Sequence, residues 1–173
     1  MGNRLFFAAL ITTLAFTGGS QTGYASDKKD LFLLEDFFVG RSTGHGVFKS
    51  WIAGVHRPFR VRLRGTRHGR TLILVEDFFY DDGERDRKTW TFVRTGPDTY
   101  EGTREDVVGK AKIKAYSDRI TLKYLVDVPT KNGKTRVRFS DVISKQDDGS
   151  VLNVARVSKF GLKIGSVRLV FKR

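Results

Sequence analysis

Apolar and basic residues alternate one by one along much of this chain. Residues 59–64 read Phe-Arg-Val-Arg-Leu-Arg, and residues 110–115 read Lys-Ala-Lys-Ile-Lys-Ala. Residues 120–128 and 167–171 repeat the alternation with other side chains. A period of two is typical of a β-strand with one buried face and one solvated face, whereas a helix needs a period of 3.6. No segment from residue 44 onward keeps a helical spacing, so the sequence predicts an all-β fold.

Short turn sequences separate the predicted strands. They are His68-Gly69, Asp82-Gly83, Gly96-Pro97-Asp98, Ser117-Asp118, Asn132-Gly133 and Asp148-Gly149. Several of these pairs tolerate positive φ, as tight hairpins require. Some nine or ten antiparallel strands with short connections form an up-and-down meander, and closure into a barrel removes its two exposed edges. We therefore predict a lipocalin-like barrel in which the last strand, residues 166–172, pairs with the first, near residues 46–52.

One short N-terminal helix is predicted, over residues 27–38. An aspartate at its start can cap it, and Leu31, Leu34 and Phe38 form a short apolar stripe. We expect this helix to cover an end or a flank of the barrel. The strand at residues 71–80 is apolar on both faces, so its outer face is predicted to need such a cover.

The first 25 residues differ from the rest of the chain. A single charge, Arg4, precedes an apolar run over residues 5–16, and a small, polar stretch follows that ends in Gly-Tyr-Ala. This is the organisation of a cleaved secretory signal, and about twelve apolar residues fall short of the roughly 20 that span a bilayer. We expect residues 1–25 to be a signal peptide and residues 26–173 to form one β-barrel domain in the periplasm, with peripheral membrane association.

The chain is strongly basic, with 32 Lys and Arg against 19 Asp and Glu and a net charge of +13. An exported protein meets anionic lipid headgroups and acidic polysaccharides rather than nucleic acid, so an anionic membrane surface is a predicted partner and nucleic acid is not. The basic residues of 59–64 and 110–115 would form that surface; the alternative is that they only solvate the barrel. The absence of cysteine excludes disulfides, thiolate chemistry and a lipid anchor on an N-terminal cysteine.

Four motifs occur in order along the predicted barrel: FFVGRSTGHGVF, VEDFFYDDGERDRKTW, YEGTREDVVGKA and LNVARVSKFGLKIGSVRLVF. Together they resemble an uncharacterised family of proteobacterial envelope proteins, many of them lipoproteins, that is known as a domain of unknown function. The resemblance implies an envelope location and a barrel similar to lipocalins, and it implies no known activity. This chain departs from the family pattern in having no lipobox cysteine and in having Val142 where the family tends to carry an aromatic residue.

Side chains two residues apart in a strand point to the same face. Charged residues that lie on the same predicted face as apolar ones are therefore candidates for a polar site inside the barrel. Glu76, Asp106 and Asp141 are three such carboxylates. The cations available to pair with them are Arg104, Arg156 and Lys159. Two interpretations are open: a network that fixes strand register or plugs a barrel end, and a patch that binds a ligand headgroup or performs acid–base chemistry.

Aromatic residues supply the other half of a predicted pocket. Trp90 and Phe92 share one strand face, and further aromatic residues lie on or near apolar faces, namely Trp51, Tyr124, Phe139 and Phe171. A barrel of about eight strands is wide enough either to be filled by side chains or to hold one small ligand. We predict that an apolar or amphipathic, lipid-like molecule binds at Trp90, Phe92, Tyr124, Phe139, Glu76, Asp106, Asp141 and Lys159.

No catalytic residue, metal ligand or cofactor is predicted. The acidic run at residues 76–84 lacks calcium-loop spacing, and His45, His56 and His68 lack metal-ligand spacing. One alternative is an enzyme in which Glu76, Asp106 or Asp141 is a general acid or base, which requires an open cavity and a raised pKa. Another is a small outer-membrane barrel with its apolar faces toward lipid. Short connections at both ends and a highly basic lumen argue against the latter.

Overall fold

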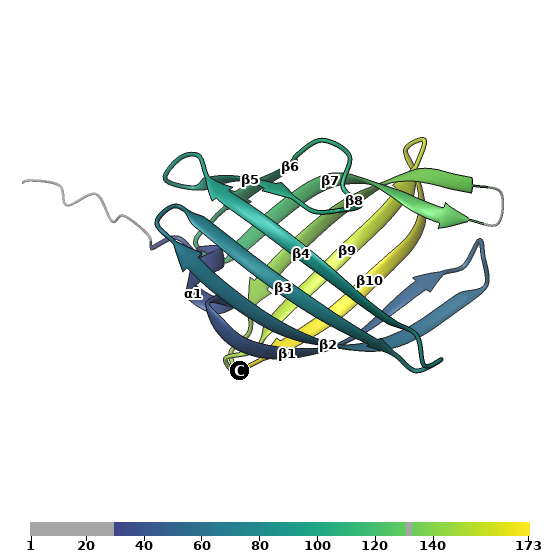
Figure 1. Cartoon of the computed structure of the whole chain (residues 1–173), viewed down its shortest axis with the longest axis horizontal. Helices are drawn as coiled ribbons and strands as arrows, with labels where there is room; N and C mark the ends of the chain where they lie inside the picture. Colours follow the sequence, from purple (N-terminus) through teal and green to yellow (C-terminus); the bar gives the residue numbers. More distant parts are fainter. Residues whose placement is uncertain (1–29, 131–132) are drawn as a thin grey trace, which may run out of the picture.

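The computed structural model describes residues 30–130 and 133–173, which form a ten-stranded antiparallel barrel with one short helix (Figure 1). The elements are α1 (Leu34–Phe38), β1 (Gly40–Ser50), β2 (Val55–His68), β3 (Thr71–Tyr80), β4 (Arg85–Arg94), β5 (Thr99–Thr103), β6 (Ala111–Ala115), β7 (Arg119–Thr130), β8 (Gly133–Lys145), β9 (Val151–Lys159) and β10 (Leu162–Lys172). Each strand pairs with the next, and β1 pairs with β10. The predicted closed meander is confirmed. The predicted signal peptide (1–25), Asp27 and the turn residue Asn132 lie outside the described residues.

The seam between β1 and β10 runs from Thr43 opposite Lys172 to Lys49 opposite Ser166. The prediction for β10 is therefore close, but β1 begins earlier than expected and ends at Ser50. Trp51 lies in the following turn and is 56% exposed, so its predicted place on an apolar face is wrong. Strand alternation stops where the chain turns, and parity has no meaning beyond that point.

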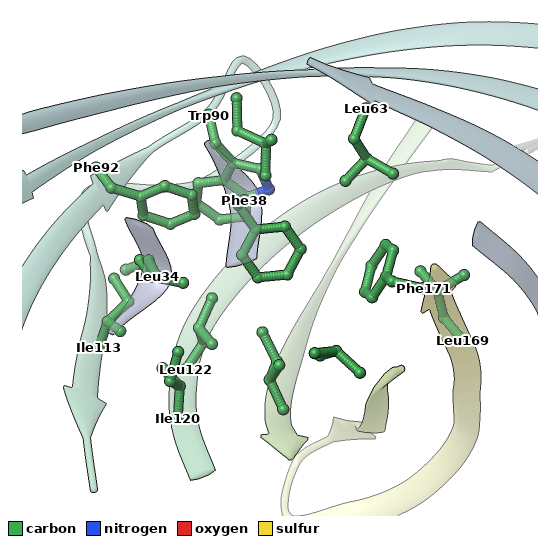
Figure 2. Packing of buried hydrophobic residues seen from close by; sticks show 14 of the residues in the cluster. Leu34, Phe38, Leu63, Trp90, Phe92, Ile113, Ile120, Leu122, Leu169 and Phe171 are labelled. Carbon is green, nitrogen blue, oxygen red and sulfur yellow. The ribbon is translucent and has the colours of Figure 1, made fainter. Parts of the chain in front are cut away.

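The apolar members of the alternating pairs point into the barrel. Phe59, Val61 and Leu63 are buried, and the arginines that follow each of them are exposed. Figure 2 shows Trp90 and Phe171 within the resulting cluster. This is the reverse of the arrangement that an outer-membrane barrel requires. Within the described ranges, no helix is long and apolar enough to cross a membrane.

The helix is much shorter than residues 27–38. The backbone N–H of Leu33 donates to the Asp36 carboxylate at 2.8 Å, which fixes the start of α1. The guanidinium of Arg173 donates to the carbonyl oxygens of Asp36 at 2.9 Å and of Phe37 at 2.6 Å, where α1 ends. The last residue of the chain therefore holds the helix at its C-terminal end.

The helix enters one end of the barrel and does not cover the outer face of β3. It packs against Gly65 so closely that a Cβ at this position would lie 1.7 Å from the Phe38 carbonyl oxygen. The predicted cover for β3 is therefore wrong. Two guanidinium groups lie over the half-buried ring of Phe79 on this outer face, that of Arg62 at 4.4 Å and that of Arg85 at 4.8 Å from the ring centre.

Turns and strand ends form the opposite end of the barrel. The β1–β2, β3–β4 and β9–β10 turns, the longer β5–β6 loop, the end of β7 and the start of β8 lie there, away from α1 (Figure 1). We call this end the rim. The barrel thus has a plugged end and a rim, and the space between them contains the candidate site.

Candidate ligand-binding cavity

A cavity of about 260 Å³ lies inside the barrel, between α1 and the rim. Leu34 and Phe38 line it from the helix, and Arg57 and Tyr80 line it toward the rim. An apolar cavity of about 150 Å³ can hold benzene, and drug-sized ligands occupy roughly 300–1,000 Å³. The cavity is therefore of a size for one small molecule.

The four predicted aromatic residues line this cavity as one stacked array. Trp90 stacks on Phe92 at 5.0 Å between ring centres and meets Tyr124 edge-on at 5.2 Å. Tyr124 in turn stacks on Phe139 at 5.2 Å with 9° between the ring planes. Alternation places all four side chains inside the barrel on β4, β7 and β8. Their role in binding stays a prediction.

Arg104 connects this aromatic array to the acidic residues. It lies just after β5, its Nε donates to Asp106 Oδ1 at 2.7 Å, and its guanidinium lies 4.7 Å from the centre of the Trp90 ring. Its Nη1 is 3.9 Å from Glu76 Oε2. The cation is thus bonded closely to one carboxylate and loosely to another.

Burial raises the pKa of Glu76 to about 7. The positive charge of Arg104 lowers this pKa and the negative charge of Asp141 raises it, but both effects are smaller than the desolvation. A separation of 3.9 Å is at the limit of an ion pair, so Arg104 offsets the burial only in part. Glu76 therefore exchanges a proton near neutral pH inside an aromatic cavity.

Asp141 is the second buried carboxylate in the lining. Its Oδ2 accepts hydrogen bonds from the Tyr124 hydroxyl at 3.4 Å and from Asn153 Nδ2 at 3.2 Å. Burial raises its pKa to about 6 despite these donors. Asp141 Oδ1 and Asn153 Oδ1 are buried without a hydrogen-bond partner in the part of the chain that the structure describes. The cavity therefore contains two adjacent residues with a free acceptor each.

Two predicted site residues do not line the cavity. Asp106 lies in the loop beyond β5, where it pairs with Arg104 and lies 3.5 Å from Lys88 Nζ. Lys159 is the last residue of β9, and its Nζ donates to Thr135 Oγ1 at 2.6 Å along the rim. Both residues are at or beyond strand ends and lie outside the lining of the cavity, and their predicted part in binding stays a prediction. Arg156, named as a third cation, is exposed on β9.

Sequence reasoning missed two polar residues of the lining. Asn153 shares its parity with Val151 and Ala155, and Arg57 shares its parity with Phe59, so the signal that identified Glu76 was also present for them. The Arg57 guanidinium lies 3.7 Å from the Tyr80 ring centre and donates to Asp82 at 2.9 Å. An ion-paired arginine therefore stands at the rim side of the cavity.

Nothing in the described ranges gathers three potential metal ligands. The histidines His45, His56 and His68 are all exposed on the barrel exterior. In the acidic turn after β3, Asp82 and Glu84 both accept hydrogen bonds from the Arg57 guanidinium. The chemistry that the cavity offers is thus that of carboxylates, an amide and aromatic rings.

Residues 11–173 match the family described as "Protein of unknown function (DUF3833)". The chain belongs to this family. The match covers every strand of the barrel and agrees with the resemblance seen in the sequence motifs. No curated protein matches the chain.

Solved structures similar to this member of the DUF3833 family are also β-barrels. The S-type phycobiliprotein lyase CPES from Guillardia theta is 10% identical, with a TM-score of 0.57 over 81% of this chain and 90% of that chain. A redesigned β-barrel, mFAP1, bound to DFHBI, is 12% identical, with a TM-score of 0.39 over 79% of this chain and 94% of that one. The likeness to the lyase supports the lipocalin-like fold.

Proposed function

We propose that the barrel binds one small apolar molecule that carries a hydrogen-bond donor. The observation that supports this most is the pair of unpartnered acceptors, Asp141 Oδ1 and Asn153 Oδ1, among the described residues that line the cavity. A buried acceptor without a donor costs about 1–3 kcal/mol. An N–H or O–H group of a ligand would recover this free energy, while its apolar part would stack in the aromatic array.

The ligand class follows from the size and charge of the cavity. With about 260 Å³, the cavity suits a ring system or one short alkyl chain rather than a complete phospholipid. Two buried carboxylates, Glu76 and Asp141, disfavour an anionic headgroup in the interior. An apolar or amphipathic alcohol, phenol or amine therefore fits better than a fatty acid.

We place this binding in the cell envelope. The pattern of residues 1–25 and the likeness of the motifs to envelope proteins support export. N-terminal sequencing of protein recovered from the periplasm is expected to begin at Ser26. A sequence that begins at Met1 would contradict cleavage of the predicted signal, and absence of the protein from the periplasm would contradict export; both would leave the cavity proposal intact.

Two matched probes test the donor requirement. 1-Naphthol carries an O–H, whereas 1-methoxynaphthalene has the same rings without a donor. The wild type should bind naphthol ~10-fold more tightly, because one recovered hydrogen bond is worth about 1.4 kcal/mol. Asp141→Leu should reduce this preference, since one of the two free acceptors is lost and Asn153 Nδ2 then lacks its own acceptor. Isothermal titration calorimetry measures both affinities.

Asp127→Asn is the control variant, because Asp127 pairs with Arg136 on the exterior, far from the lining. It should leave the ratio of the two affinities unchanged. Equal affinities of the wild type for both probes would contradict the donor requirement. A lack of binding to either probe would contradict the ligand-binding proposal itself.

A second candidate function is general acid–base catalysis. The condition set by the sequence argument, a carboxylate that faces a cavity and has a raised pKa, is met by Glu76. Mass spectrometry of small molecules that copurify with the wild type and with Glu76→Gln separates the two functions. A binding protein should hold the same molecule in both forms, whereas an enzyme should hold unreacted substrate only in the variant.

A further inference from the structure

The most exposed large apolar side chains of the described residues gather at the rim. Trp51 and Ile52, in the β1–β2 turn, are 56% and 67% exposed. Phe160 and Leu162, at the β9–β10 turn, are 93% and 72% exposed. We call these four side chains the rim patch. Other large apolar residues with high exposure are valines on the barrel, such as Val93 at 43%.

The two turns of the rim patch lie next to each other. Strands β1 and β10 are paired, and the Ser50 hydroxyl donates to the Ile164 carbonyl oxygen at 2.8 Å near the base of both turns. Lys163 Nζ lies 5.2 Å from the centre of the Trp51 ring, so a side chain from one turn reaches over the other. The four apolar side chains are therefore carried by two turns on neighbouring strands at the same end of the barrel.

Phe160 occupies a backbone position that disfavours it. Its φ is 50° and that of Gly161 is 82°, so both central residues of this turn are left-handed. Asparagine or glycine suits the first of these positions, and a bulky side chain there is an outlier. A ring that is 93% exposed contributes little burial to offset this strain. Burial on folding therefore does not explain why a phenylalanine occupies the tip of the β9–β10 turn.

The surroundings of the rim patch are basic. Residues 37–75 and 149–173, which include β9, β10, β1 and β2, contain no Asp or Glu. They contain eight and six Lys or Arg, respectively. Lys49 and Lys159 stand behind the patch on these strands, and Lys159 Nζ lies 5.4 Å from the Phe160 ring. Two acids of the β3–β4 turn at the rim, Asp82 and Glu84, are bonded to Arg57.

We infer that the rim patch inserts into the surface of a bilayer that contains anionic phospholipid. In such a surface, the acyl chains lie beneath a layer of negative headgroups. If the apolar tips reach the acyl chains, the lysines behind them lie at the level of the headgroups. Trp51 is suited to this boundary because its indole N–H can stay near water while its rings contact the acyl region, and the wholly apolar Phe160 ring gains by leaving water. This inference does not depend on the cavity binding a ligand, but it would place the rim side of the cavity toward the membrane.

Vesicle cosedimentation tests the inference with a variant that separates folding from binding. Phe160→Asn should raise the melting temperature, because asparagine tolerates the left-handed backbone. It should nevertheless weaken binding to vesicles of equal phosphatidylglycerol and phosphatidylcholine ~10-fold, since an apolar ring no longer enters the bilayer. Val93→Asn is the matched control, which removes an exposed apolar side chain from β4 and should leave binding unchanged. Ile52→Ser provides an independent change in the other turn.

Trp51 gives a direct optical readout. The second tryptophan, Trp90, is 4% exposed and already in an apolar environment, so a blue shift of emission on adding vesicles would report Trp51. The inference is overturned if the wild type stays in the supernatant, binds pure phosphatidylcholine equally well, or loses nothing in Phe160→Asn and Ile52→Ser. A wild-type dimer that dissociates in Phe160→Asn without any vesicle binding would assign the patch to a second copy of the chain. Naphthol titration of Phe160→Asn should match the wild type, which separates this result from the cavity proposal.

Discussion

Two walls of the same barrel carry charge in opposite ways on their outer surfaces. On the wall formed by β3–β8, bases meet acids: Arg87 donates to Asp77 at 2.6 Å, and Arg136 donates to Asp127 at 2.8 Å. The wall formed by β9, β10, β1 and β2 has no acid in its strands or in the β9–β10 and β1–β2 turns that join them. We call these the paired wall and the acid-free wall. The chain's whole net charge of +13 can be attributed to the second, because 18 bases and 19 acids lie elsewhere.

The contrast reverses inside the barrel. The paired wall and its β5–β6 loop supply the buried ionisable groups Glu76, Arg104 and Asp141, whereas the acid-free wall supplies mainly apolar side chains, Asn153 and, on the rim side, Arg57. The basic composition of the chain therefore says nothing about the character of its interior. It describes one outer surface, and the chemistry of the cavity comes from the other wall.

The largest effect is expected from removing the buried cation of the paired wall. Arg104→Leu would leave Asp106 and Glu76 without their guanidinium partner, and breaking a buried pair costs about 3–5 kcal/mol. Urea denaturation followed by tryptophan fluorescence measures the loss. Arg136→Leu, which breaks an exposed pair with Asp127, is the control and should change the midpoint little. Similar losses of stability in both variants would show that the buried pairs of Arg104 contribute no more than an exposed ion pair.

A smaller, pH-dependent effect is expected at Glu76. Because its pKa is raised to about 7 in the folded protein, the native state binds more protons than the unfolded chain between about pH 4.5 and 7. Stability should therefore fall as pH rises through this window, by about 3 kcal/mol or less. Glu76→Gln should be more stable than the wild type at pH 8 and similar to it at pH 5.

Denaturation midpoints at both pH values measure this slope. Asp141, whose pKa is raised to about 6, should add a slope of the same sign that persists in Glu76→Gln. An unchanged difference between pH 5 and pH 8 in the variant would mean that Glu76 does not carry the effect.

The smallest effect is expected from neutralising surface bases. Lys49→Gln with Arg60→Gln, on the acid-free wall, should weaken binding to phosphatidylglycerol vesicles about fivefold, since each base near an anionic surface contributes ~1 kcal/mol at most. Lys112→Gln with Lys114→Gln should have less effect, because these lysines already face Glu101 and Asp98. Cosedimentation at low and high salt measures both. Equal losses of vesicle affinity in the two double variants would show that bases of the acid-free wall bind the membrane no better than bases of the paired wall.

Parity along the strands predicted much of the barrel and part of the cavity. Glu76 and Asp141 lie within long strands, where each residue's face follows from counting, and both are buried as expected. Closure between the first and last strands also followed from the number and shortness of the connections. These features depend on backbone geometry that repeats with every second residue.

Features at strand ends could not be predicted in this way. Asp106, Lys159 and Trp51 lie at or past the last residue of a strand, where turn dihedrals rather than parity set the direction of a side chain. Asn153 Oδ1 is free because the Nδ2 atom of the same side chain donates to Asp141 on the neighbouring strand. This contact depends on the distance between the two side chains, which the sequence does not give. The same holds for the choice between a cavity and a filled core.

The pairing of β1 with β10 carries a charge penalty when its register slips by two residues. In the observed register Lys49 faces Ser166 and Arg168 faces Val47, so the bases of one strand lie opposite neutral residues of the other. A slip of two residues, the smallest that keeps the apolar face inside, would set Lys49 against Arg168 in one direction and Arg41 against Lys172 in the other. Like charges directly opposite each other destabilise a strand pair. The register of this last pairing sets the stagger, and with it the circumference, at which the barrel closes. The charge pattern along β1 and β10 thus favours one circumference, and it disfavours pairing of these strands with those of another, misaligned chain.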